Sequence, residues 1–159
     1  MSEIIGYNVD GEIVDTQSYT GGGSEIKFDN SKEALEIIRH SCAHLMAAAI
    51  KELYPDVKFF VGPAIEDGFY YDMRVSKSDG SKLGEDDLAI IEKKMKELAL
   101  AKTSIVKINS TKSEVAAKYA DDDLKQEVLK RIPDGAVSLY SQGGFEDICR
   151  GPHIPNTIF

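Results

Sequence analysis

Two short clusters, which together contain every histidine of the chain, most constrain how this sequence can fold. The first is His40-Ser-Cys-Ala-His44 and the second is Cys149-Arg-Gly-Pro-His153. Because each cluster ends in two imidazole or thiol groups four residues apart, we expect the two clusters to build a single site. They lie near opposite ends of the sequence, so the fold must bring residues 40–44 against residues 149–153.

The composition is that of a globular domain without a membrane span. A length of 159 residues with 42% hydrophobic residues is enough for one domain with a core and a small appendage. No apolar window is long enough to cross a bilayer, and the N-terminus lacks the features of a secretory signal. Cys42 and Cys149 are too few for a disulfide framework, so we expect free thiols and a cytoplasmic location.

The charge and the missing motifs narrow the possible functions. The sequence has 27 acidic and 19 basic residues, a net charge of -8. Non-specific nucleic-acid binders are usually basic because they neutralise phosphates with Lys and Arg. If the chain acts on a nucleic acid, something else must therefore provide most of the affinity. No Gly-rich nucleotide-binding loop or serine nucleophile elbow is present, so nucleotide binding and serine-hydrolase chemistry have no support.

Residues 1–30 are expected to form an N-terminal β-hairpin appendage and a Gly-rich joint, separate from a domain over residues 31–159. The segments 4–9 and 12–14 flank Asp10-Gly11, a sequence that favours a two-residue hairpin turn. A long helix is then predicted over residues 31–53. Asn30 is a suitable N-cap for this helix, with Glu33 three residues later as a capping box requires.

The rest of the chain predicts shorter elements without regular strand–helix alternation. A second hairpin turns at Asp67-Gly68, and the segment 121–131 fits either a helix or a strand. Further helices are predicted over 85–101 and 111–119, and further strands over 103–109, 137–140 and 145–149. This order favours an α+β fold with an antiparallel β-sheet packed against helices.

Local geometry places the site residues on two different supports. His40 and His44 are one helical turn apart, so their imidazoles point the same way from the predicted helix. Gly151-Pro152 will not extend a helix, so Cys149 and His153 are expected on a turn that follows a strand. Asp147 would share the face of Cys149 on that strand.

The spacing leaves three chemistries open for these groups. Three nitrogen or sulfur ligands plus a fourth suit a tetrahedral zinc ion. Imidazoles suit general acid–base catalysis near neutral pH without a metal. A thiolate beside imidazoles can also act as a nucleophile. Each cluster alone would more commonly be structural, and it is their combination that favours a functional site.

Three segments share their order and spacing with one known family. They are His40-Ser-Cys-Ala-His44-Leu45, Val61-Gly-Pro-Ala-Ile-Glu-Asp-Gly-Phe-Tyr-Tyr-Asp72 and Asp147-Ile-Cys-Arg-Gly-Pro-His-Ile-Pro-Asn156. Together they resemble the N-terminal editing domain of bacterial threonyl-tRNA synthetase, in the threonyl/alanyl-tRNA synthetase second additional domain family. The resemblance covers residues 31–159 and implies the two-layer α/β sandwich of that family.

The resemblance implies post-transfer editing, which is hydrolysis of serine from tRNA(Thr) wrongly charged with it. Serine lacks one methyl group of threonine, a difference worth only about 1–3 kcal/mol of discrimination in a binding pocket. A second site is then needed to remove the serine. The implied partner is the tRNA(Thr) acceptor end charged with serine, with no membrane involved. ATP and threonine would be used only by a ligase core that this chain lacks, and the full-length enzyme would be a homodimer.

The resemblance also assigns roles to individual residues. It implies catalytic roles for a set of five residues: His40, His44, Lys125, Cys149 and His153. Tyr71 and Asp147 would bind the substrate. Threonyl editing domains resemble zinc-binding alanyl relatives yet work without the metal, so we expect no required cofactor. If zinc binds, its ligands would be His40, His44, Cys149 and His153. Since only residues 1–30 precede the first predicted helix and no core follows, we expect a piece of a longer synthetase.

Two other functions remain compatible with the residues. The first is a zinc-dependent hydrolase or lyase acting on a small molecule, with the His/Cys clusters as metal ligands. S-ribosylhomocysteine lyases share the His-x-x-x-His helix, but not the segment 61–72 or Cys-Arg-Gly-Pro-His. The second is a non-catalytic tRNA-binding domain, whose binding would not depend on the histidines.

Overall fold

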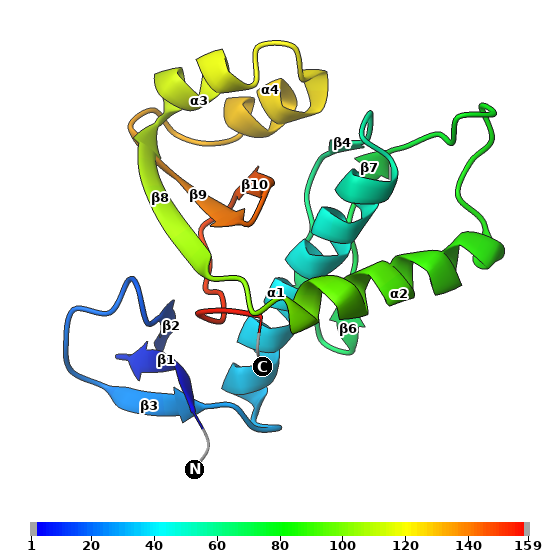
Figure 1. The fold of residues 1–159 in the computed structure, drawn as a ribbon. Coiled ribbons are helices and arrows are strands. Elements are labelled where there is room, and N and C mark those ends of the chain that lie inside the picture. The colour runs from blue at the N-terminus through cyan, green and yellow to red at the C-terminus, as the bar shows by residue number, and fades with distance from the viewer. Residues whose placement is uncertain (1–2, 158–159) are drawn as a thin grey trace.

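A computed structural model describes residues 3–157 and has a mixed α+β fold (Figure 1). The helices are α1 (Lys32–Leu53), α2 (Glu85–Leu100), α3 (Lys112–Lys118) and α4 (Asp123–Lys130). The first seven strands are β1 (Ile4–Val9), β2 (Glu12–Asp15), β3 (Ser24–Lys27), β4 (Lys58–Phe59), β5 (Ala64–Ile65), β6 (Gly68–Phe69) and β7 (Met73–Arg74). The last three are β8 (Ile105–Thr111), β9 (Ala136–Gln142) and β10 (Phe145–Ile148).

All strand pairs are antiparallel, which confirms the α+β class predicted from the sequence. The strands form two three-stranded sheets, β2-β1-β3 and β10-β9-β8, and two short pairs, β4-β7 and β5-β6. The expected N-terminal hairpin is present as β1-β2, and β3 extends it on the other side of β1. Within the described residues, none of the helices combines the length and the apolar character needed to cross a membrane.

The start of helix α1 differs by one residue from the prediction. Ser31, not Asn30, is the N-cap, because its hydroxyl accepts a hydrogen bond from the Ala34 N–H at 3.3 Å. Asp29 accepts a hydrogen bond from the Ser31 N–H at 2.8 Å, which fixes the approach to the helix. The helix ends at Leu53, as predicted, and Tyr54, the residue before Pro55, is the C-cap.

Helix α1 lies at the centre of the fold and takes part in two of three core clusters (Figure 1). Its N-terminal half packs with the first sheet and the C-terminal segment through Ile5, Ile26, Ala34, Ile37, Cys149 and Ile154. Its C-terminal half packs against α2 through Ala47, Ala48, Ile50 and Ile91. The third cluster joins α3 and α4 to the β10-β9-β8 sheet through Val115, Leu129, Val137 and Leu139.

The segment after β2 joins the first sheet to the edge strand β8. The Gln17 side chain donates to the Ile105 carbonyl at 2.7 Å and accepts from the Lys107 N–H at 2.8 Å. The side-chain amide of Gln17 thus pairs with one backbone N–H and one backbone carbonyl on the open edge of β8, where no neighbouring strand pairs with them. Lys107 also donates from Nζ to the Ser18 hydroxyl at 2.9 Å.

Two structural details of the remaining chain matter for the site. The segment 121–131, which fitted either a helix or a strand, forms α4, with Asp122 as its N-cap. The second hairpin is present as the short pairs β4-β7 and β5-β6, and between them Gly62 packs on Tyr71. A Cβ at Gly62 would lie only 2.3 Å from the Tyr71 ring, so glycine is needed to seat that ring.

We expect Ile37→Ala to destabilise the protein by about 2–5 kcal/mol, because it removes a fully buried side chain from the cluster that joins three segments. Ile90→Ala is the matched control, since Ile90 is exposed on α2 and its loss should change stability by less than about 0.5 kcal/mol. Urea denaturation measures both values. An equal effect of the two substitutions would contradict the central packing of α1.

Candidate active site

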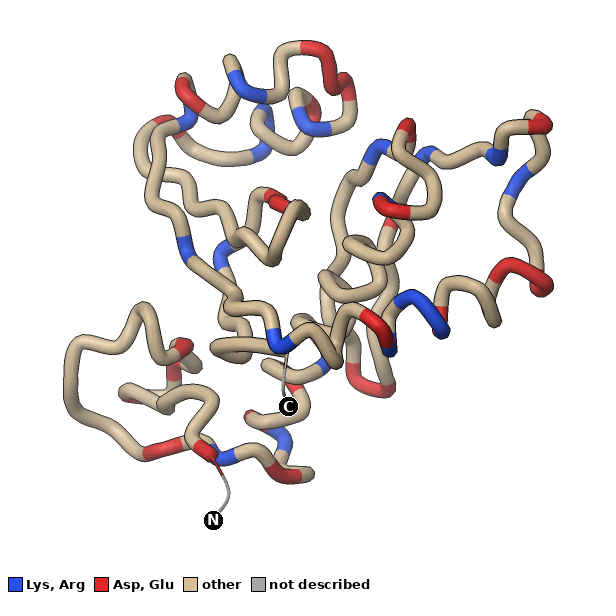
Figure 2. The backbone as a smooth tube through the Cα atoms, in the orientation of Figure 1, with Lys and Arg blue, Asp and Glu red and all other residues tan. Residues whose placement is uncertain are grey.

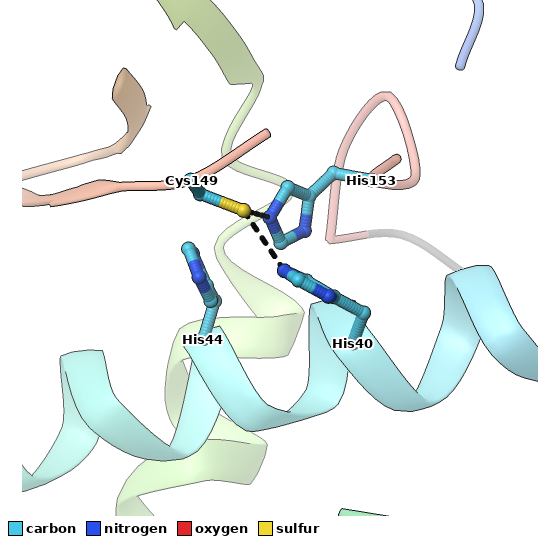
Figure 3. Close-up of side chains that lie close together, drawn as sticks. All are labelled: His40, His44, Cys149 and His153. Atoms are coloured by element: carbon cyan, nitrogen blue, oxygen red, sulfur yellow. Dashed lines mark hydrogen bonds between the residues drawn. The ribbon is translucent and has the colours of Figure 1, made fainter. Parts of the chain in front are cut away.

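The structure brings the two histidine clusters together, as the sequence predicted (Figure 3). One ligand atom from each of His40, His44, Cys149 and His153 lies within 4.8 Å of the others. The Cys149 Sγ atom lies 2.9 Å from His40 Nε2 and 3.3 Å from His153 Nε2. The ring centroid of His153 is 4.4 Å from that of His40 and 4.2 Å from that of His44. The imidazoles and the thiol therefore form one compact group.

Two local features position these side chains. His40 and His44 project from successive turns of α1, as Figure 3 shows. The turn after β10 carries Cys149 and His153, and Gly151 in this turn has a φ of 77°, a conformation that favours glycine. A Cβ at Gly151 would lie 2.3 Å from the Tyr140 hydroxyl, so the turn also packs closely on β9. The Gly151 N–H donates to Cys149 Sγ at 3.2 Å.

The group faces a cleft of about 1200 Å³ between α1, the segment 60–67 and the turn after β10. Five residues with sequence-predicted roles line this cleft: His40, His44, Tyr71, Asp147 and Cys149. His153 and Lys125 are buried and are not among its lining residues. Two of the three imidazoles therefore line the cleft, although His44 is only 4% exposed, whereas His153 supports the group from the interior.

A buried charge network forms one wall of the cleft. Asp147 on β10 is 2% exposed and forms an ion pair with Lys125, which is 3% exposed in the first turn of α4. Asp147 also accepts a hydrogen bond from the Tyr71 hydroxyl, and Lys125 donates to the Phe60 carbonyl at 3.2 Å. Lys125, which the resemblance alone had singled out, thus reaches the site through Asp147.

Burial keeps the imidazoles and the thiol of the metal-free protein neutral. Desolvation lowers the pKa of His40 to about 4 and lowers the pKa values of His44 and His153 well below 6.5. Desolvation also raises the pKa of the Cys149 thiol to about 12. A neutral thiol is a poor nucleophile, which disfavours the thiolate chemistry left open by the sequence. Neutral imidazoles keep a lone pair that can accept a proton.

The donor set fits a metal ion. Zinc binds imidazole nitrogen at about 2.0–2.1 Å and thiolate sulfur at about 2.3 Å in tetrahedral geometry. Three nitrogens and one sulfur within 4.8 Å of one another match that donor set. His153 Nδ1 contacts the Ser41 hydroxyl at 3.1 Å, the kind of outer contact that orients a metal-binding imidazole. If all four residues held the ion, the tetrahedral site would be closed to water; if three of them held it, the ion would act as a Lewis acid on a water in the fourth position.

The sequence analysis missed three residues that contact the site: Ser41, Asp15 and Tyr140. Ser41 contacts His153 Nδ1 and accepts a hydrogen bond from the Ile154 N–H at 3.0 Å. Its buried place between two histidines on α1 was the available signal. Asp15 accepts hydrogen bonds from the His153 N–H at 3.2 Å and from the Tyr140 hydroxyl. Nothing in the sequence connects Asp15 with residues so far along the chain.

We expect Lys125→Met to destabilise the protein by about 3–5 kcal/mol, because it leaves the buried Asp147 carboxylate without its cation. Adding Asp147→Asn should recover part of this loss, since it removes the unpaired charge. Lys130→Met on the same helix is the control, because this exposed lysine pairs with Glu127 at the surface and should change stability by less than about 1 kcal/mol. Urea denaturation of the three variants and the wild type tests the pair, and no recovery in the double variant would contradict it.

Comparison with known proteins finds one family match and several similar proteins. The family model described as "Threonyl and Alanyl tRNA synthetase second additional domain" matches residues 137–159. The threonine--tRNA ligase of Campylobacter hominis is 68% identical over 164 residues, which cover 100% of this chain and 27% of the ligase. The corresponding ligase of Campylobacter concisus is 68% identical over 162 residues, with the same two coverages. The ligase of a Campylobacter jejuni strain is 66% identical over 158 residues, which cover 99% of this chain and 26% of that protein.

The chain therefore spans about a quarter of the length of the ligases it matches. The family description covers the turn with Cys149 and His153, whereas the ligases match the whole site, including the helix with His40 and His44. Residues 137–159 therefore match the threonyl and alanyl tRNA synthetase second additional domain, and the whole chain is similar to part of threonine--tRNA ligases.

Proposed function

We propose that this chain is an editing domain that hydrolyses serine from mischarged Ser-tRNA(Thr). The observation that carries the proposal is the group of neutral imidazoles facing the cleft next to a buried carboxylate. Hydrolysis of an aminoacyl ester needs a base for water and a pocket for a small amino acid, and both are available here. The relatives named threonine--tRNA ligase support tRNA(Thr) as the nucleic acid involved.

In this proposal His40 is the base that activates water. It is the most exposed of the three imidazoles, it lines the cleft, and its lowered pKa keeps it unprotonated at neutral pH. His40 takes a proton from water while the water oxygen attacks the ester carbonyl carbon of the serine. The tetrahedral intermediate collapses by breaking the bond to the ribose oxygen, which takes up the proton from His40 and leaves as a hydroxyl. His44 lies beside His40, with ring centroids 5.2 Å apart, and also lines the cleft.

The other site residues hold the amino acid in this proposal. The Asp147 carboxylate faces the cleft and can accept hydrogen bonds from the α-ammonium group of serine. Lys125 stays paired with Asp147 and holds the carboxylate in place, with Tyr71 as its second partner. Cys149 Sγ, whose position is fixed by His40 and the Gly151 N–H, forms the apolar side of the pocket.

The charges of this chain fit a proposal in which it contacts only the acceptor end of the tRNA. Lys32, Arg39 and Arg150 line the cleft and can contact phosphates of an acceptor strand. Glu36, Glu66 and Asp67 line the same cleft, and over the rest of the chain Lys and Arg positions are also scattered among Asp and Glu positions, as Figure 2 shows. With a net charge of -8, this chain would bind a whole tRNA weakly by itself. Assays therefore need high substrate concentrations.

We expect this chain to deacylate Ser-tRNA(Thr) faster than Thr-tRNA(Thr), and His40→Ala to slow the reaction by about 10²–10⁴-fold through loss of the base. Release of labelled amino acid under single-turnover conditions measures these rates. Lys96→Ala, which changes an exposed lysine on α2, is the control and should leave the rate unchanged. Equal cleavage of both substrates would exclude selection against the methyl group. An unchanged rate in His40→Ala would exclude this residue as the base.

The zinc-dependent alternative has one observation in its favour, which is the donor set of the cluster. Zinc coordinated by His40 would occupy the lone pair that the proposed base needs, so the two functions predict opposite effects of chelation. We expect deacylation of Ser-tRNA(Thr) to continue at the same rate after chelation and dialysis, with metal content measured by elemental analysis. Loss of activity on chelation and its return with one equivalent of zinc would instead establish the metal-dependent enzyme.

A further inference from the structure

We infer that Asp15, in the N-terminal sheet, is a positioning residue for the turn that carries Cys149 and His153. The sequence alone suggested that residues 1–30 are an appendage of the domain. Asp15 ends β2 in that segment, and its side chain contacts two elements of the site that lie at the far end of the sequence. The inference rests on the proposed function only in so far as the turn is part of a catalytic site.

The carboxylate of Asp15 is buried, and both of its oxygens accept hydrogen bonds. Asp15 is 1% exposed. One oxygen accepts the Ser18 N–H at 2.9 Å, and the other accepts both the Tyr140 hydroxyl and the His153 N–H, the latter at 3.2 Å. A buried carboxylate is retained at such a place only when several donors satisfy it. These donors come from the N-terminal segment, β9 and the C-terminal turn, so one side chain joins three parts of the chain.

The contacts of Asp15 fix the backbone on which the site is built. The His153 backbone is held by Asp15, while its imidazole contacts Ser41 through Nδ1 and Cys149 through Nε2. Gly151 packs closely against Tyr140 and Asp15, since a Cβ at Gly151 would lie 2.3 Å from the Tyr140 hydroxyl and 3.0 Å from Asp15 Oδ2. Movement of the carboxylate would therefore release both the turn and the imidazole that rests against Cys149.

Asparagine at this position cannot reproduce the contacts. The amide has one oxygen where the carboxylate has two, so in either orientation its NH₂ group faces a backbone N–H, that of Ser18 or that of His153. Asp15→Asn thus keeps the size of the side chain and breaks one contact. Asp10→Asn is the matched control, because Asp10 is exposed in the turn of the same hairpin, where Asn-Gly is equally suitable.

The test compares wild type, Asp15→Asn and Asp10→Asn in the same chain. We expect Asp15→Asn to lower kcat for Ser-tRNA(Thr) deacylation by about 10- to 100-fold, with KM within about twofold, because the reacting groups are displaced while the cleft remains. Urea denaturation at the assay temperature establishes the folded fraction, so that kcat is given per folded molecule. Asp10→Asn should match the wild type in every measurement.

Histidine side-chain nitrogen resonances provide a second measurement that does not require activity. The chain contains only three histidines, so the ¹H–¹⁵N spectrum of the imidazoles can be assigned by substitution. We expect both His153 nitrogens to shift in Asp15→Asn and not in Asp10→Asn. If the His153 resonances shift but wild type releases no serine, the positioning role stands and the proposed function fails. If folded Asp15→Asn has wild-type kcat and His153 resonances, the positioning role is wrong.

Tyr140→Phe covers the case in which Asp15→Asn does not fold. It removes one donor to Asp15 and retains the ring that packs on His153, with centroids 4.6 Å apart. We expect a loss of kcat of about 3- to 10-fold and a smaller shift of the His153 resonances, since one of the contacts is lost. Wild-type kcat and resonances in this variant would overturn the inference.

Discussion

The fold depends on burying the turn after β10 against helix α1 without leaving its polar groups unpaired. His153 has no exposed surface, and a buried imidazole is costly unless its nitrogens find partners. Ser41 contacts Nδ1, Cys149 contacts Nε2, and Asp15 accepts from the backbone N–H. Three segments that are distant in the sequence meet at one residue. The packing of Ile37 with the first sheet and the C-terminal segment surrounds this contact with apolar side chains.

A second buried network, centred on Asp147, fixes the other side of the cleft. Asp147 pairs with Lys125 and accepts from Tyr71, so β10, α4 and the segment before β7 are tied to one carboxylate. Burial raises the pKa of Asp147, and the Lys125 ammonium opposes that shift. The two networks meet at the end of β10, where Asp147 on the strand and Cys149 directly after it line the same cleft. Polar contacts thus fix both sides of the cleft.

The parts of the structure that sequence could predict are those set by local patterns. The spacing of His40 and His44 on one helix, the turn at Gly151 and the hairpin at Asp10-Gly11 follow from neighbouring residues. Lys125 was different, because the segment 121–131 fitted two kinds of element and only the resemblance pointed to it. Asp15 had no local signal at all, since its role depends on partners more than a hundred residues away. A tertiary contact made by a single polar residue leaves no periodic pattern in the sequence from which it could be predicted.

The lone pairs of the imidazole nitrogens limit which chemistry the His/Cys cluster can perform. Burial keeps the imidazoles unprotonated and the Cys149 thiol protonated, which suits proton transfer by His40 and disfavours attack by sulfur. A bound metal ion would reverse both conditions, because it would take the imidazole lone pairs and stabilise the thiolate. One arrangement of four side chains therefore supports either a base or a metal site, but not both at once. In either case the position of His153 is fixed by the same contacts, because Ser41 contacts its Nδ1 and Asp15 accepts a hydrogen bond from its backbone N–H.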